Sequence, residues 1–123
     1  MFDVFIKTHF SAGHHLRNYP GNCEFPHGHN WNVEVKVRAE KLDDLGMGVD
    51  FRTVKQAVKT VMDDLDHRDL NEHPDFQDKN PSSENLAQHI YNRLKTPLST
   101  DRYRLYSVTV GETDSTGVIY SEE

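Results

Sequence analysis

Three histidines near the N-terminal end of the chain stand where they could bind one metal ion. His27 and His29 flank Gly28 at the start of a stretch that alternates apolar and polar residues. Side chains two residues apart on a strand point to the same side, so both imidazoles can reach one ion. His14 ends the preceding alternating stretch and reaches the same ion if the two strands pair as a hairpin. Three histidines leave a coordination position open, which is the arrangement of a catalytic Zn²⁺.

Other ligand sets remain open at this point. The chain has eight histidines in 123 residues, and a single His-x-His pair also occurs by chance on protein surfaces. His15 could replace His14, and His9 is a third candidate on the same strand. Cys23 could complete a closed, structural zinc shell beside three histidines.

Cys23 is also a candidate for proton transfer. It is the only cysteine and lies four residues before His27. A thiol beside a cation has a lowered pKa and becomes a candidate base or nucleophile at neutral pH. The competing interpretation is a small buried apolar residue, which is the common fate of a free cysteine.

Three other polar residues stand at the ends of predicted elements. Asp66 and His67 are adjacent at the end of a predicted helix and form a candidate proton relay, provided that the following loop bends. Glu112 extends the apolar row of a strand. A buried carboxylate there needs a partner, such as the N–H groups of a bound ligand, whereas exposure at the strand end is the alternative.

The hydrophobic pattern predicts the elements that position these residues. Period-2 alternation predicts strands over about 2–10, 27–39, 106–110 and 118–120, and helical spacing predicts helices over 51–65 and from Ser82 to about Pro97. Asp50 and Ser82 are suitable N-caps. The order β-β-α-α-β-β predicts an α+β domain over residues 1–123, with helices on one face of an antiparallel four-stranded sheet. Exposed sheet edges favour pairing between subunits.

Composition limits the function classes. The net charge of −6, without any long block of Lys or Arg, argues against a nucleic-acid partner. No apolar run approaches the roughly 20 residues needed to cross a bilayer, so we expect no membrane span. A single cysteine allows no intrachain disulfide, and the N-terminus lacks the features of a signal peptide. We therefore expect a cytoplasmic protein.

Taken together, these residues resemble the 6-pyruvoyltetrahydropterin synthase and 6-carboxytetrahydropterin synthase family. The resemblance covers nearly the whole chain and follows the order of the family's motifs. The matching segments are Phe10-Ser11-Ala12-Gly13-His14, Cys23-x-x-x-His27-Gly28-His29-Asn30, Val49-Asp50-Phe51, Leu65-Asp66-His67, Asn80-Pro81-Ser82-Ser83-Glu84-Asn85-Leu86 and Glu112-Thr113.

The resemblance implies a fold and an assembly. The expected fold is the tunnelling fold (T-fold), in which subunits join their sheets into a barrel and two rings stack, commonly as a homohexamer. The resemblance also implies that Zn²⁺ is bound by His14, His27 and His29, which decides for His14 over His15.

The resemblance further assigns roles to the polar residues. It implies that Cys23 is the catalytic base, and that Asp66 and His67 form a proton-relay pair contributed across a subunit interface. Glu112 is implied to anchor the pterin ring. Ser82 stands where the family has a substrate-binding Thr or Ser.

The implied activity is that of a zinc-dependent lyase acting on 7,8-dihydroneopterin triphosphate. The product would be 6-carboxy-5,6,7,8-tetrahydropterin, for 7-deazaguanine (queuosine) biosynthesis. Glu24 follows Cys23, so the loop also fits a Glu-x-x-His-Gly-His pattern, which resembles folate-pathway variants that release 6-hydroxymethyl-7,8-dihydropterin. Members with both residues resemble a bifunctional subgroup, although Glu24 could also be a solvated loop residue. The alternatives are a 6-pyruvoyltetrahydropterin synthase, a mainly folate-type enzyme, or a non-catalytic pterin-binding oligomer with structural zinc.

Overall fold

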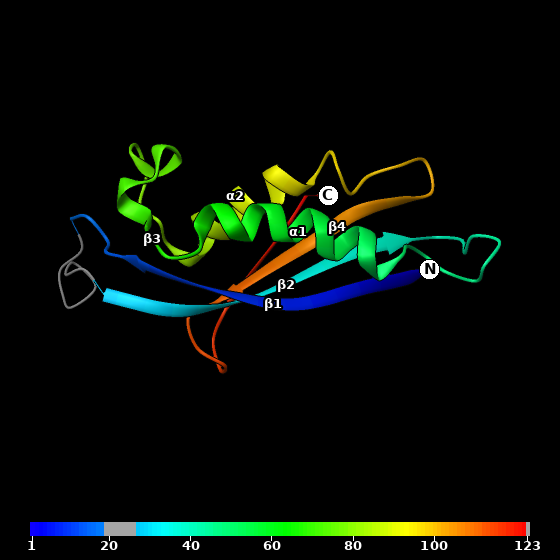
Figure 1. Cartoon of the computed structure of the whole chain (residues 1–123), viewed down its shortest axis with the longest axis horizontal. Helices are drawn as coiled ribbons and strands as arrows, with labels where there is room; N and C mark the ends of the chain where they lie inside the picture. The colour runs from blue at the N-terminus through cyan, green and yellow to red at the C-terminus, as the bar shows by residue number, and fades with distance from the viewer. Residues whose placement is uncertain (19–26, 123) are drawn as a thin grey trace.

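The computed structural model describes residues 1–18 and 27–122, so Cys23 and Glu24 lie outside the described residues. Within these residues, two long helices and five strands follow one another, and Figure 1 shows how they are arranged. In order, they are β1 (Phe2–His14), β2 (His27–Ala39), α1 (Phe51–Leu65), β3 (Arg68–Asp69), α2 (Ser83–Leu94), β4 (Tyr103–Gly111) and β5 (Val118–Ser121). Two short 3₁₀ turns, Leu70–Glu72 and Pro74–Phe76, lie between β3 and α2.

The five strands form one sheet in the order β3-β1-β2-β4-β5. All neighbours are antiparallel except β3, which runs parallel to β1. Both long helices lie on the same face of this sheet, while the turn between β4 and β5 projects from the opposite face (Figure 1). The predicted α+β class, with both helices on one face of the sheet, is confirmed.

The stretch predicted as a loop over residues 66–79 contains a short strand, β3, that the pattern missed. Strand β3 has only two residues, which is too short to show any periodicity. It is held beside β1 by the backbone, because the His67 N–H donates to the Ser11 carbonyl oxygen at 2.6 Å. The sheet therefore has five strands instead of four.

Pairing between β1 and β2 places the three histidines together. The two strands form the predicted antiparallel hairpin pair, with His14 opposite His27 and Ala12 opposite His29. His27 and His29 share one face of β2 with the buried Trp31, which follows in the same alternating row. The histidines thus continue the apolar face of the sheet at its end.

The core lies between this sheet face and the two helices. Trp31 is fully buried and stacks on Phe10, with ring centroids 6.0 Å apart. Each helix begins at its predicted cap, because Asp50 accepts from the Arg52 N–H and Ser82 accepts from the Asn85 N–H. Within residues 1–18 and 27–122, no helix combines the length and apolar character that a membrane crossing requires.

Candidate metal centre

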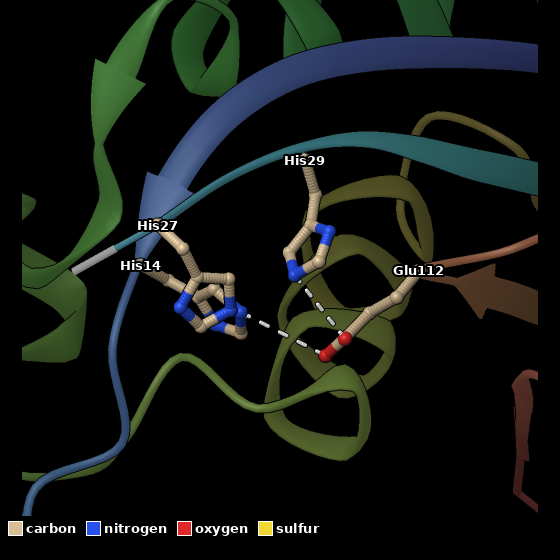
Figure 2. A group of neighbouring side chains, drawn as sticks. All are labelled: His14, His27, His29 and Glu112. Carbon is tan, nitrogen blue, oxygen red and sulfur yellow. Dashed lines mark ion pairs between the residues drawn. The ribbon is translucent and has the colours of Figure 1, made fainter. Parts of the chain in front are cut away.

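Four side chains converge at the end of the β1–β2 hairpin. His14 comes from the end of β1, His27 and His29 come from the start of β2, and Glu112 follows the end of β4 (Figure 2). One ligand atom of each lies within 4.8 Å of the others, which is close enough for all four to surround a single ion. The cluster lies where the ends of three neighbouring strands, β1, β2 and β4, meet.

The imidazole rings stand edge to face. The ring centroids of His14 and His27 are 4.5 Å apart, those of His27 and His29 are 4.5 Å apart, and those of His14 and His29 are 5.2 Å apart. Trp31 lies beneath them, with its ring centroid 4.7 Å from that of His14. This indole limits how the rings can rotate, so the cluster is held in place by the core.

His14 is fixed in the form that a metal needs. Its Nδ1 donates to the carbonyl oxygen of Pro81 at 2.7 Å, which leaves the lone pair of Nε2 directed into the cluster. His14 is only 2% exposed, and burial lowers its pKa because desolvation disfavours the imidazolium. The ring is therefore neutral at physiological pH.

Two ring nitrogens in the cluster lack hydrogen bonds. The Nε2 atoms of His14 and His29 are buried, and neither has a hydrogen-bond partner in the part of the chain that the structure describes. A buried polar atom without a partner is destabilising. Two such atoms aimed at one point fit the binding of a divalent cation, and neutral imidazoles suit Zn²⁺ and its neighbours in the first transition row.

Glu112 lies beside the coordination position that three histidine ligands would leave open. Its Oε2 lies 3.3 Å from His29 Nε2 and its Oε1 lies 3.7 Å from His14 Nε2, as the dashed lines in Figure 2 mark. The side chain is 34% exposed, so its carboxylate also reaches solvent. The group can serve as a fourth ligand or can bind a molecule that approaches the metal.

Asp66 and His67 form a pair at the surface of the protomer. Asp66 accepts the Ser11 N–H at 2.8 Å and lies 2.8 Å from His67 Nδ1. These two contacts lower the pKa of Asp66, the Ser11 N–H most of all. The bend that the pairing requires is present, because His67 has φ +56°, in the left-handed region.

The pair does not belong to the histidine cluster. The His67 side chain is 82% exposed, and among the described residues the cluster consists of the four side chains named above. Asp66 orients the imidazole, and the imidazole points into solvent. A second surface would have to meet His67 for the pair to act on a molecule held at a histidine cluster.

The structure also shows where Ser82, His15 and His9 lie. The Ser82 hydroxyl accepts the Asn85 N–H at 3.1 Å and caps α2. His15, the alternative ligand, lies beside Asn71, whose Oδ1 accepts the His15 backbone N–H at 2.9 Å. His9 is exposed. Cys23 and Glu24 were predicted as catalytic residues and are outside the described residues.

Sequence reasoning missed two features of the site. It did not bring Glu112 to the histidines, because that contact depends on the β2–β4 register, in which Asn32 pairs with Gly111. It also missed the Pro81 carbonyl as the acceptor for His14. No local pattern signals either contact, since each joins distant parts of the chain.

Comparison with known proteins gives a consistent match. A sequence model described as 6-pyruvoyl tetrahydropterin synthase matches residues 3–123. The chain is similar to the 6-carboxy-5,6,7,8-tetrahydropterin synthase of Bacillus subtilis, with 32% identity over 97% of this chain and 84% of that protein. It is also similar to the 6-pyruvoyl tetrahydrobiopterin synthase of Dictyostelium discoideum, with 34% identity over 84% of this chain and 76% of that protein.

A solved structure has the same fold. The 6-pyruvoyl tetrahydropterin synthase of Caenorhabditis elegans superposes with a TM-score of 0.84 and 28% identity, over 99% of this chain and 96% of that chain. The two proteins therefore share the T-fold topology.

Proposed function

The chain belongs to the 6-pyruvoyl tetrahydropterin synthase family, and we propose that it is a zinc-dependent 6-carboxy-5,6,7,8-tetrahydropterin synthase. The substrate is 7,8-dihydroneopterin triphosphate, and the product serves 7-deazaguanine (queuosine) biosynthesis. The observation that carries the proposal is the pair of buried, unbonded Nε2 atoms of His14 and His29 beside Glu112. We assign residues 1–123 to one catalytic domain and the reaction to the cytoplasm, where a single free cysteine stays reduced.

We assign the metal to His14, His27 and His29. The Pro81 carbonyl fixes the His14 tautomer, and the β1–β2 register holds the other two imidazoles on the same face. When bound, Zn²⁺ supplies Lewis acidity to oxygen atoms of the substrate side chain. The role of the protein here is to hold three neutral nitrogens in a fixed geometry and leave room for the substrate.

Glu112 holds the pterin ring in this proposal. Its two carboxylate oxygens form charge-assisted hydrogen bonds with the N–H groups of the ring, which are stronger than neutral ones. Because the carboxylate lies within 3.7 Å of the metal-binding nitrogens, a ring held by it keeps its side chain next to the metal. That is a positioning role, and it requires the carboxylate to turn away from the histidines when substrate binds.

Proton transfer is assigned to Cys23 and to the Asp66–His67 pair. Cys23 removes a carbon-bound proton of the substrate as a thiolate base. Asp66 holds the His67 imidazole through Nδ1, so His67 can exchange a proton through Nε2. We also propose that the Ser82 hydroxyl contacts the substrate and that Glu24 adds a folate-type activity that releases 6-hydroxymethyl-7,8-dihydropterin.

An oligomer completes the site. The exposed His67 would act on substrate held by another subunit, as in the hexamer of two stacked rings that we propose. The sheet presents apolar residues for such contacts, since Phe5 is 51% exposed on β1 and Ile119 is 69% exposed on β5. Strand edges and exposed apolar faces are the features that subunit pairing covers.

A second product is supported by the relatives. The proteins of Dictyostelium discoideum and Caenorhabditis elegans carry the name 6-pyruvoyl tetrahydro(bio)pterin synthase, whereas that of Bacillus subtilis carries the 6-carboxy name. The alternative activity is therefore formation of 6-pyruvoyltetrahydropterin from the same substrate.

Product analysis tests the proposal. Protein loaded with Zn²⁺ is incubated with 7,8-dihydroneopterin triphosphate, and the pterins and small aldehydes are identified by mass spectrometry. We expect 6-carboxytetrahydropterin with acetaldehyde, and loss of turnover but not of zinc in Cys23→Ala. The 6-pyruvoyl product would favour the alternative enzyme, and hydroxymethyl-dihydropterin would assign Glu24 a catalytic role. The absence of any product would favour a pterin-binding protein.

A further inference from the structure

A second cluster of potential metal ligands lies away from the candidate metal centre. Asp64 comes from the last turn of α1, His73 from the junction between the two 3₁₀ turns, and His89 from the middle of α2. One ligand atom of each lies within 4.8 Å of the others. The proposed reaction uses none of these three side chains.

We propose that Asp64, His73 and His89 form a second site for a divalent transition-metal ion such as Zn²⁺. A set of two imidazoles and one carboxylate binds ions of this class in preference to Mg²⁺ or Ca²⁺. The two histidines are 4% and 8% exposed, whereas the Asp64 side chain is 33% exposed. The ion would thus be held from inside by nitrogen and reached from solvent on the carboxylate side, where water completes the shell.

His89 provides the observation that points to a ligand. It is more than nine-tenths buried, and its Nε2 has no hydrogen-bond partner within residues 1–18 and 27–122. Its Nδ1 lies 3.8 Å from the Asp75 carboxylate, so the other ring nitrogen is the one available to an ion. Burial lowers the pKa of His89 and keeps the imidazole neutral, which is the form that binds metals.

His73 already touches the carboxylate that would share the ion. Its Nε2 lies 2.8 Å from Asp64 Oδ2, and its Nδ1 accepts the Asp75 backbone N–H at 3.1 Å. Binding an ion through Nε2 moves the ring proton to Nδ1, at the loss of that backbone contact. The Asp75 carboxylate lies 3.9 Å from Nδ1, so a small movement would let it accept a hydrogen bond from the Nδ1–H group.

Asp75 therefore stands behind both imidazoles. Its Oδ2 faces Nδ1 of His73 and Nδ1 of His89 at nearly equal distances, 3.9 and 3.8 Å. A carboxylate behind a metal-binding histidine fixes the tautomer and raises the basicity of the ligand. With an ion on the two Nε2 atoms, both Nδ1–H groups would face the Asp75 carboxylate.

Asp64 is held ionised and in place. Arg93 Nη1 lies 3.2 Å from Oδ2, and Arg68 Nη1 lies 3.2 Å from Oδ1. The hydrogen bond from His73 is the main cause of the lowered pKa of Asp64, and Arg93 adds to it. Carboxylate oxygens have more than one lone pair each, so Asp64 can keep an arginine contact while binding an ion.

The bound ion would cross-link three segments. It would join the end of α1 to the 3₁₀ turns and to α2. Its ligand on α1, Asp64, lies two residues before Asp66. An ion that binds the native state and not the unfolded state stabilises the native state. The melting temperature would therefore rise with metal concentration.

A Co²⁺ titration tests the second site independently of the first. The double variant His27→Ala/His29→Ala removes two imidazoles from the candidate metal centre and isolates the second cluster. We expect wild-type protein to bind about two Co²⁺ per chain and the double variant about one, with visible absorption bands from nitrogen and oxygen ligands. Adding Asp64→Asn, or His89→Gln if that variant folds better, should abolish the remaining binding. Adding His9→Gln, an exposed histidine, should leave it unchanged.

The outcomes are decisive in both directions. Binding of about one Co²⁺ by the double variant, lost with Asp64→Asn in a chain of unchanged circular dichroism, supports the second site. A folded double variant that binds no Co²⁺ overturns it, and so does equal binding with Asp64→Asn. The double variant lacks two histidines of the candidate metal centre, so its Co²⁺ binding reports on the second site alone. The result therefore holds even if the proposed enzymatic function is wrong.

Discussion

Glu112 Oε2 lies 3.3 Å from Nε2 of His29, and Oε1 of the same carboxylate lies 3.7 Å from Nε2 of His14. The first contact joins the end of β4 to the start of β2, across strands that are distant in sequence. It gives one carboxylate two possible partners, a metal ion and a pterin ring. The role of Glu112 therefore separates a closed metal site from an enzyme that keeps a position for substrate.

Replacing Glu112 by Gln distinguishes these roles. If the carboxylate anchors the pterin ring, Glu112→Gln should keep the metal and raise KM by about 10- to 100-fold, the equivalent of losing one charge-assisted hydrogen bond. Metal content and steady-state kinetics check this. Glu84→Gln, an exposed change on α2, is the matched control. Loss of the metal with Glu112→Gln would instead identify Glu112 as a ligand.

The exposed position of His67 predicts sites shared between subunits. Cys23→Ala and His67→Ala should each be inactive, because the proposed reaction assigns a proton transfer to each residue. When the two variants are mixed and reassembled, activity should return, up to about a quarter of wild type for random mixing. The measurement is turnover before and after reversible dissociation. No recovery in a mixture of verified hetero-oligomers would place both groups in the same subunit.

Ser82 has a structural role that can be separated from substrate binding. Ser82→Ala removes the N-cap of α2 and should destabilise the protein by about 1 kcal/mol. Ser82→Asp keeps a capping oxygen and should retain the stability. If the hydroxyl also contacts substrate, KM rises in both variants. Urea denaturation and kinetics together check this, and an unchanged KM in Ser82→Ala would leave only the capping role.

The two buried histidines with lowered pKa values predict the pH dependence of stability. In the metal-free protein the folded-state pKa of His14 and of His89 lies below the ordinary 6.5. As the pH falls below about 6.5 the unfolded chain binds these protons first, so stability decreases, with a slope of up to about 1.4 kcal/mol per pH unit for each group. The loss ends below the folded-state pKa values.

Urea denaturation in EDTA at about pH 7.5 and about pH 5.5 measures this loss. His89→Gln removes one of the two groups and should make the decrease smaller. The carboxylates with lowered pKa values, such as Asp64 and Asp66, titrate below this window and do not contribute to it. An equal decrease in wild type and His89→Gln would contradict the burial of a neutral His89.

Much of the fold followed from local signals. The alternation in 27–39 marks a strand with one face in the core, and β2 spans the same residues. Asp50 and Ser82 cap the two helices, since short polar side chains satisfy the free N–H groups of a first turn. Strand β3 escaped prediction because its two residues depend on a backbone contact between His67 and Ser11.

The candidate site was predictable where neighbouring strands form it. His14, His27 and His29 meet because β1 and β2 are consecutive and pair as a hairpin. Glu112 and the Asp64–His73–His89 cluster depend on contacts between elements far apart in the chain, for which the sequence carries no periodic signal. Long-range register and helix docking, not residue type, decide those positions.

Zinc titration of the metal-free protein tests the central claim most directly. The starting protein is the Asp64→Asn variant, in which the proposed second site is disabled. Turnover of 7,8-dihydroneopterin triphosphate is measured after each addition of Zn²⁺. Activity should rise in proportion to Zn²⁺ and level off at about one ion per chain, and His29→Ala in the same background should stay inactive. Full turnover in the metal-free protein, or equal activity in His29→Ala, would contradict a catalytic metal at His14, His27 and His29.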